Sequence, residues 1–115
     1  MKNKYNAIRS ICNQGHVHVS RKEKNRCNEL TLLERNGNIK WLKQQPVFTL
    51  QTKFEYRGET IKAITYRADF SYFDPESKKF TVEDVKGVRT ELYKVKRKIL
   101  IFTMRDRDDF QFLET

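Results

Sequence analysis

Three residues within the segment 65–98 carry the side chains that a divalent-metal site would use: Asp69, Asp84 and Lys86. Carboxylates are hard oxygen ligands, and Mg²⁺ typically binds one or two of them while waters and phosphate oxygens fill its other positions. Such an ion can generate hydroxide from bound water and stabilise the charge of a phosphodiester under attack. An ammonium group beside it could orient the nucleophile or neutralise the phosphate. The chemistry to which these side chains are suited is therefore phosphodiester hydrolysis.

A β-hairpin is the element that would bring the two carboxylates together. Residues 61–73 alternate as a strand does, and the Asp-Pro-Glu-Ser sequence at 74–77 is a turn signal, because proline presets φ and the polar side chains bond their own backbone. A second strand is expected over residues 79–86. If the hairpin folds about the middle of the turn, Phe73 lies opposite Phe80.

The same register sets Asp69 opposite Asp84. Opposed Cβ atoms in an antiparallel pair are about 4.5 to 5.5 Å apart, so the two carboxylates would converge on one point. Since side chains along a strand alternate between its two faces, Lys86 then lies on the same face as Asp84. A slip of one residue would instead direct Glu83 at Asp69.

A helix before the hairpin supplies a further candidate acid, Glu23. The helix is expected to run from Ser20 to about Asn36, where an Asn-Gly pair is a stop signal. Ser20 and Glu23 fit a capping box, which would be a purely structural role for the glutamate. However, Glu23 is in register with Cys27, so it continues the buried stripe of the helix toward the sheet, where a carboxylate could reach a metal. Glu29, on another face, is the fallback acid.

A second helix is expected to begin near Thr90, with a buried stripe formed by Leu92, Val95, Ile99 and Phe102. The basic residues of this helix could simply form a face that is exposed to solvent. However, the helix starts just beyond Lys86, and helix N-termini favour anions. Contacts to the DNA backbone are therefore expected from Arg89, Thr90, Lys94 and Lys96, and from Lys22 and Arg26 on the outer side of the first helix.

The remaining apolar segments complete a small core. Residues 47–56 are expected to form a strand that turns back into the strand of Asp69, so that the strand pattern predicts an antiparallel meander between the two helices. Residues 39–42, with the lone Trp41, are expected to close the core beside the first helix. A final short strand is expected at 110–113, alongside the sheet.

The motif residues resemble a known signature. Asp69, followed after fourteen residues by Asp84-Val85-Lys86-Gly87, resembles the bipartite PD-(D/E)xK signature of restriction-like metal-dependent nucleases, with Ala68 in place of the family's proline. Over roughly residues 4–100 the chain looks like a small phage-encoded branch of that superfamily. It is similar to endonuclease I type Holliday junction resolvases and to the cutting subunit of some transposases.

The resemblance implies a mixed α/β (α+β) fold with a restriction-endonuclease-like core, in which helices flank a central mixed sheet. It also implies DNA cleavage that depends on Mg²⁺ or Mn²⁺. Asp69, Asp84 and the Val85 carbonyl would hold the ion, Glu23 would complete the shell or bind a second ion, and Lys86 would position the attacking water. Gln45 resembles a polar residue beside the metals in this family, although a hydrogen bond at the strand entry would explain it equally well.

Length and charge agree with a small protein that binds a polyanion. The 115 residues are expected to form one domain, with residues 1–10 as a flexible basic arm, and an enzyme this small often dimerises. The net charge of +9 is unevenly placed. Two basic flanks, residues 1–26 and 86–107, carry +6 each, the last eight residues carry −3, and the middle that holds the candidate carboxylates sums to zero. Two cysteines without a pairing pattern, no apolar run long enough for a bilayer and no signal peptide predict a cytoplasmic protein without membrane partners.

Several readings of the function remain open. The leading interpretation is a DNA endonuclease acting on branched or double-stranded DNA as a homodimer, in phage recombination or packaging. A second is a noncatalytic DNA-binding or phage regulatory protein on a nuclease scaffold. A third is an RNA-directed or transposase-like cutter, which differs only in substrate.

Overall fold

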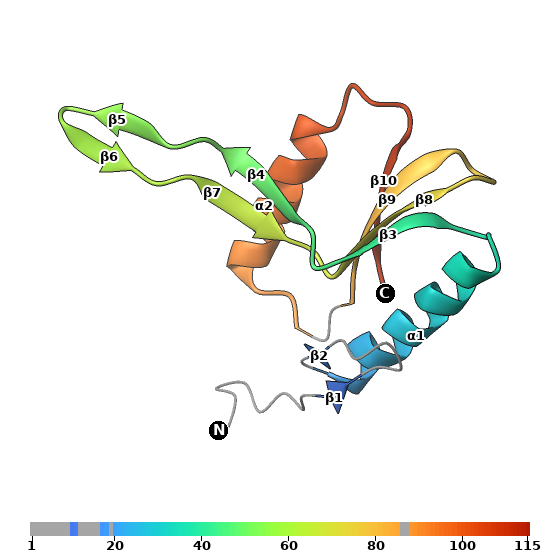
Figure 1. The fold of residues 1–115 in the computed structure, drawn as a ribbon. Helices are drawn as coiled ribbons and strands as arrows, with labels where there is room; N and C mark the ends of the chain where they lie inside the picture. Colours follow the sequence, from blue (N-terminus) through green and yellow to red (C-terminus); the bar gives the residue numbers. More distant parts are fainter. Residues whose placement is uncertain (1–9, 12–16, 19, 86–87) are drawn as a thin grey trace.

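The computed structural model describes residues 10–11, 17–18, 20–85 and 88–115 (Figure 1). The described part contains two helices and ten strands, which confirms the expected mixed α+β class. In chain order the elements are β1 (Ser10–Ile11), β2 (Val17–His18), α1 (Arg21–Arg35), β3 (Lys40–Gln44), β4 (Val47–Gln51), β5 (Phe54–Tyr56), β6 (Glu59–Ile61), β7 (Ile64–Arg67), β8 (Phe70–Asp74), β9 (Lys79–Asp84), α2 (Glu91–Thr103) and β10 (Phe110–Glu114). Neither helix is long and apolar enough to span a bilayer.

Both helices begin and end at the local signals in the sequence. The side chain of Ser20 caps α1 by accepting a hydrogen bond from the Glu23 backbone N–H at 3.1 Å. After the C-terminal cap at Asn36, Gly37 adopts φ +77, a conformation that side chains disfavour. Thr90 caps α2 in the same way, through the backbone N–H of Tyr93. The predicted bounds of α1 and the predicted start of α2 are confirmed.

The central sheet has the strand order β10-β9-β8-β3. β8 pairs antiparallel with both β3 and β9, whereas β10 pairs parallel with β9. The antiparallel pairing predicted for the strands between the two helices is therefore confirmed, and the final strand, expected alongside the sheet, joins it in the parallel direction. A parallel neighbour requires a crossover connection, and α2 supplies it between β9 and β10. The resulting sheet is mixed and flanked by helices, as expected.

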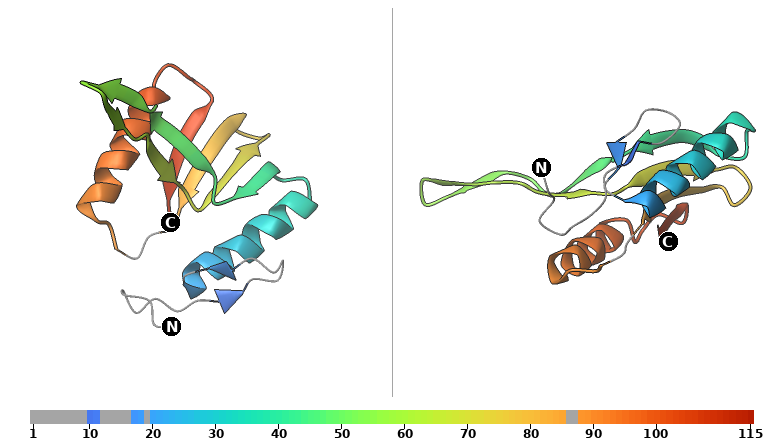
Figure 2. Two further views of the ribbon diagram at one scale, coloured as in Figure 1. Left: turned by 60° about the vertical axis from the view of Figure 1, so that its left-hand side comes forward. Right: turned by 90° about the horizontal axis from the view of Figure 1, so that it is seen from below.

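The two helices cover opposite faces of this sheet (Figure 2). On the α1 face, Cys27 and Leu30 of the helix pack with Phe70 and Tyr72 of β8. On the α2 face, the buried members of the cluster are Tyr66, Ala68, Val82, Tyr93 and Leu100. Since neighbouring strand residues point to opposite faces, each residue of β9 is assigned to one helix or the other.

The segment 40–74 is a long two-stranded ribbon interrupted by bends. Beyond β3 and β8 it continues as β4 with β7 and then β5 with β6, which project away from the sheet (Figure 1). Arg57 and Gly58 close the ribbon, and both have positive φ, as a two-residue hairpin with a type I′ turn requires. The expected single strand over 61–73 is therefore wrong, because the chain bends twice before it enters the central sheet as β8.

One prediction about the core is confirmed in part, and another is wrong. Ile39 and Leu42 close the core beside α1, as expected, but Trp41 does not. Trp41 is 69% exposed: it lies on the edge strand β3, at a register shift, and contacts the ring of Phe73 with 5.3 Å between ring centroids. In α2 the expected stripe faces outward, with Leu92, Val95 and Phe102 all more than half exposed. Tyr93 and Leu100 carry the buried side of this helix instead.

Candidate functional site

The register of the β8–β9 hairpin agrees with the prediction from the turn. Phe73 pairs with Phe80, and Phe70 pairs with Glu83. Continuing this register by one step sets Asp69, which directly precedes β8, opposite Asp84 at the end of β9. The predicted opposition of the two carboxylates is therefore confirmed.

Two hydrogen bonds tie Asp69 and Asp84 together. The Asp69 backbone N–H donates to Asp84 Oδ1 at 3.1 Å, and the Val85 N–H donates to Asp69 Oδ2 at 2.7 Å. Asp84 is fully buried, whereas Asp69 is partly exposed. Each carboxylate thus has one oxygen fixed by a backbone amide of the other strand, and the pair can be reached from the Asp69 side.

Gln45 lies beside this pair through its backbone. Its N–H donates to the Asp69 carbonyl at 2.9 Å, and the Ala68 N–H donates to the Pro46 carbonyl at 3.0 Å. Gln45 has φ +50 at this bend of the ribbon, and its side chain is exposed. The strand-entry hydrogen bond is thus present, and a role for the Gln45 side chain beside a metal stays a prediction.

Glu83, the alternative acid in a slipped register, lies on the α1 face and is fully buried. Arg26 Nε donates to its Oε2 at 2.5 Å and Arg26 Nη2 to its Oε1 at 2.9 Å. The hydroxyls of Tyr72 and Thr115 donate to the same two oxygens, at 2.7 and 3.1 Å. Glu83 therefore belongs to a buried hydrogen-bond network on the face opposite to Asp69.

This network shifts the ionisation of both of its larger donors. The hydrogen bond to Glu83 is the main cause that raises the pKa of the Arg26 guanidinium. Burial, followed by the hydrogen bond to Glu83, raises the pKa of the Tyr72 phenol. Both donors are thus held in their protonated forms. Arg26 also reaches the exposed Glu29 through Nη1 at 2.9 Å, so several of its N–H groups are engaged within the protein.

Glu23 is buried on α1, in the same stripe as Cys27 and Leu30, as its register predicts. α1 covers one face of the sheet, and the alternation of β9 places Asp84 with Val82 on the other face. Within the described ranges, no group of three or more His, Cys, Asp or Glu side chains could hold a metal ion. The proposed share of Glu23 in a metal site stays a prediction. Lys86, the predicted lysine of the site, lies outside the described residues.

Glu114 is an acid near the site that the sequence analysis did not select. In the parallel ladder it pairs with Asp84, so the two side chains share the α2 face. Arg89 donates to its Oε2, and Arg97 Nε lies 2.7 Å from its Oε1. Burial raises the pKa of the neighbouring Tyr93 phenol, and the charges of Asp84 and Glu114 raise it further. The sequence carries no local signal for this contact, since it depends on the parallel register.

The predicted DNA contacts are spread over two parts of the molecule. On α2, Lys94 is exposed and pairs with Glu91 at 3.2 Å, Lys96 is half-buried, and the Thr90 hydroxyl is used in the helix cap. On α1, Lys22 is exposed. The expected place of Arg26 on the outer side of this helix is wrong, because its guanidinium faces Glu83 of the sheet. That these residues contact DNA remains a prediction.

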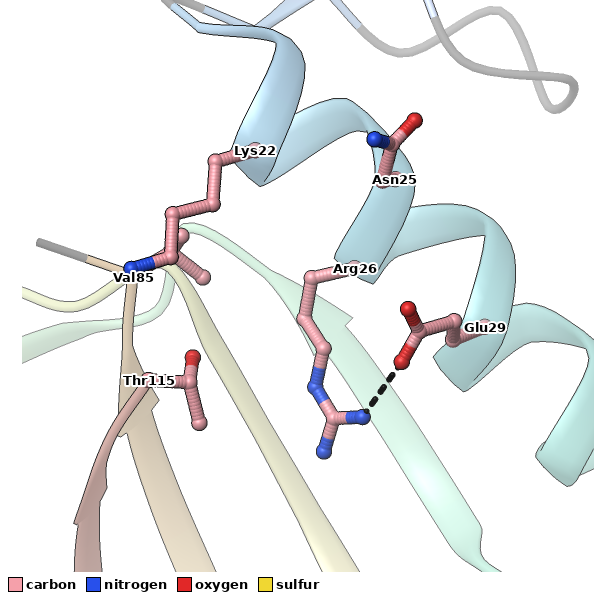
Figure 3. Close-up of a pocket in the computed structure, with 6 residues that line it drawn as sticks. All are labelled: Lys22, Asn25, Arg26, Glu29, Val85 and Thr115. Atoms are coloured by element: carbon pink, nitrogen blue, oxygen red, sulfur yellow. Dashed lines mark hydrogen bonds and ion pairs between the residues drawn. The ribbon is translucent and has the colours of Figure 1, made fainter.

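A pocket of about 450 Å³ opens between α1 and the ends of β9 and β10 (Figure 3). Its α1 wall includes Lys22 and Arg26, and Val85 and Thr115 lie across from them. Val85 links the pocket to the acid pair, because its backbone N–H is bound to Asp69. A ligand in this pocket would therefore lie next to the carboxylates but on the other side of the strand end.

Residues 2–112 match the family described as protein of unknown function (DUF1064), and the chain belongs to that family. No curated protein and no solved structure matches the chain. The family description assigns no activity, so the function must be argued from the site itself.

Proposed function

We propose that the chain is a divalent-metal-dependent DNA endonuclease that hydrolyses phosphodiester bonds. The observation that carries this proposal is the alignment of Asp69 with Asp84 at the ends of two neighbouring strands, cross-linked by the two backbone hydrogen bonds. Two ionised carboxylates at opposed positions of neighbouring strands repel each other, and a cation between them would offset that repulsion. The mixed sheet flanked by helices agrees with the restriction-endonuclease-like core that the PD-(D/E)xK resemblance implies.

The donor set fits Mg²⁺ or Mn²⁺. Asp69 and Asp84 supply two hard oxygens, and the Val85 carbonyl is a candidate third ligand, which leaves positions for water and phosphate. A bound ion would lower the pKa of its water and stabilise the negative charge of the phosphodiester under attack. Around it, the two amide hydrogen bonds fix the carboxylates, and Lys86 would orient the attacking water. Glu23 would complete the shell by reaching past the strand ends, because α1 covers the other face of the sheet.

Branched DNA, such as a Holliday junction, is the substrate we favour, in phage recombination or packaging. The two basic flanks of the sequence suit contacts to phosphates on both sides of the acid pair. Phosphate contacts position a protein without reading sequence, which suits a structure-selective enzyme. We further propose a homodimer, because the exposed apolar side of α2, with Leu92, Val95 and Phe102, offers a surface for a second copy.

A noncatalytic DNA-binding or phage regulatory protein is the second candidate. It is favoured by the position of Glu23, which lies on the helix opposite to the acid pair, and by the lack of a three-residue metal cluster within the described ranges. Ion binding separates the two candidates. Binding to the native state alone raises stability by mass action, so an enzyme should melt at a higher temperature with Mg²⁺ or Mn²⁺ and the binding protein should not.

The direct test is incubation with four-way junction, flap, linear duplex and single-stranded DNA, with and without Mg²⁺ or Mn²⁺. Cleavage of the junction that requires the ion is the expected result. Binding without cleavage under all ionic conditions would favour the second candidate, and cleavage that persists in a chelator would contradict the metal site.

A further inference from the structure

Two arginines near the acid pair hold one carboxylate between them. Each oxygen of Glu114 faces a different guanidinium: Oε2 accepts from Arg89, and Oε1 lies 2.7 Å from Arg97 Nε. The arginines come from the approach to α2 and from its middle, and Glu114 comes from the end of β10. An anion with two oxygens held by two guanidinium groups has the same hydrogen-bonding chemistry as a phosphate bound through its non-bridging oxygens.

The position of this cluster connects it to the acid pair. Glu114 is the ladder partner of Asp84, and the Thr115 N–H donates to the Asp84 carbonyl at 2.9 Å. Neighbouring strands are about 4.7 to 4.9 Å apart, so the arginine cluster begins one strand away from Asp84. A DNA strand whose phosphodiester lay at the acid pair would bring another of its phosphates to this place.

We propose that Arg89 and Arg97 form a binding site for a DNA backbone phosphate, and that Glu114 occupies this site as an internal competitor when DNA is not bound. The inference rests on the proposed function, and it adds Arg97 and Glu114 to the DNA-binding surface. DNA must displace the carboxylate before its phosphate can reach the arginines. Glu114 therefore lowers the affinity for DNA in general and favours substrates that make several contacts at once.

The exposure of the three side chains permits this exchange. The side chains of Arg89 and Arg97 are 58% and 39% exposed, and that of Glu114 is 17% exposed. The pair with Arg89 is the more open to solvent and the more screened by salt, so it is the pair that DNA displaces at the lower cost in free energy. A polyanion gains in addition from the release of its condensed counterions.

The test compares two substitutions that remove one negative charge each from opposite ends of β10. Glu114→Gln releases Arg89 and Arg97 beside the acid pair. The matched control is Asp109→Asn, just before the other end of the strand. Both oxygens of Asp109 accept from the single guanidinium of Arg107, at 3.0 and 2.9 Å, so this substitution also frees an arginine. Affinity for a four-way junction is measured in chelator over a range of salt, so that no cleavage interferes.

Glu114→Gln should bind the junction roughly three- to tenfold more tightly than the wild type and with a steeper salt dependence, since two ion pairs of this kind are lost. Asp109→Asn should bind as the wild type does. In double-mutant cycles, Arg89→Gln or Arg97→Gln alone should reduce the gain from Glu114→Gln, and both together should abolish it. Equal affinity of Glu114→Gln and wild type would overturn the inference, as would the same gain in Asp109→Asn.

Failure of the inference is distinguishable from failure of the proposed function. If the wild type cleaves the junction but Glu114→Gln does not change its affinity, only the inference is wrong. If the wild type neither binds nor cleaves DNA, the function itself is wrong. Should Glu114→Gln not fold, the double substitution Arg89→Gln and Arg97→Gln probes the same site: weaker binding with a flatter salt dependence supports it, and unchanged binding overturns it.

Discussion

Arg26 and Glu83 form a two-pronged ion pair between α1 and β9, with both oxygens of a fully buried carboxylate bound by one guanidinium. The pair joins two elements that are 57 residues apart in the sequence. Tyr72 and Thr115 complete the hydrogen bonds of the carboxylate, which offsets the cost of burying its charge. The network therefore fixes α1 on the sheet, next to the pocket and the acid pair.

Removal of this guanidinium should destabilise the fold. Arg26→Ala leaves the buried charge of Glu83 without its cation, and we expect a loss of about 2 to 4 kcal/mol in the free energy of unfolding, because breaking a buried pair costs more than the pair contributes. Glu29→Gln is the control, since it removes the exposed partner of the same arginine and should cost under about 1 kcal/mol. Urea denaturation measures both. Equal, small effects would mean that Glu83 is not held as an ion in this network.

Alkaline pH should weaken the fold through Tyr72 and Tyr93. The pKa of both phenols is raised in the folded state above the ordinary value of 10.0, chiefly by burial. The folded state thus keeps these protons more tightly than the unfolded state does. Their contribution to stability is full below about pH 10 and is lost as the pH rises toward the folded pKa, by up to about 1.4 kcal/mol per pH unit for each tyrosine.

Thermal unfolding between about pH 9 and pH 12 tests whether stability falls as the pH rises, because the two tyrosines contribute to this slope through the same proton linkage. Tyr72→Phe should reduce the alkaline loss, while Tyr56→Phe, which removes an exposed phenol on the ribbon, should leave the slope as in the wild type. A melting temperature that rises with pH in this range would contradict the predicted direction.

Loss of the buried carboxylate should abolish cleavage but not DNA binding. Asp84→Asn keeps the shape of the side chain and removes the charge that a divalent ion requires, so we expect no cleavage of a four-way junction in Mg²⁺ and nearly wild-type affinity. Glu76→Gln, which changes an exposed acid in the turn of the same hairpin, should retain full activity. A variant at Asp84 that still cuts would remove this residue from the proposed metal site.

Features set by local sequence were predictable, and features set by long-range contacts were not. The caps of α1 at Ser20 and Asn36, and the register that opposes Asp69 and Asp84, follow from short signals within a few residues of each element. The parallel pairing of β10 depends on a crossover, and with it the contact between Glu114 and the arginines. No pattern within 110–114 records which strand it will join.

The orientation of α2 shows why its face could not be chosen from periodicity alone. The helix has apolar residues on two sides, and the stripe with the more regular spacing is the one left exposed. The buried side of α2 places the aromatic ring of Tyr93 against that of Tyr66, with 6.3 Å between ring centroids. Packing on the ribbon and sheet thus outweighs the simple helical pattern.

Two leucines on opposite sides of α2 test this orientation. Leu100 is 1% exposed in the α2-face cluster, so Leu100→Ala should lower the free energy of unfolding by about 2 to 5 kcal/mol through lost burial and the cavity left behind. Leu92 is 64% exposed, and Leu92→Ala should change it by less than about 0.5 kcal/mol in a dilute monomer, since surface substitutions rarely do more. Urea denaturation at two protein concentrations measures both. A large loss for Leu92→Ala that appears only at the higher concentration would indicate that a second copy covers this face, and a large loss at both concentrations would mean that α2 packs with the predicted stripe inward.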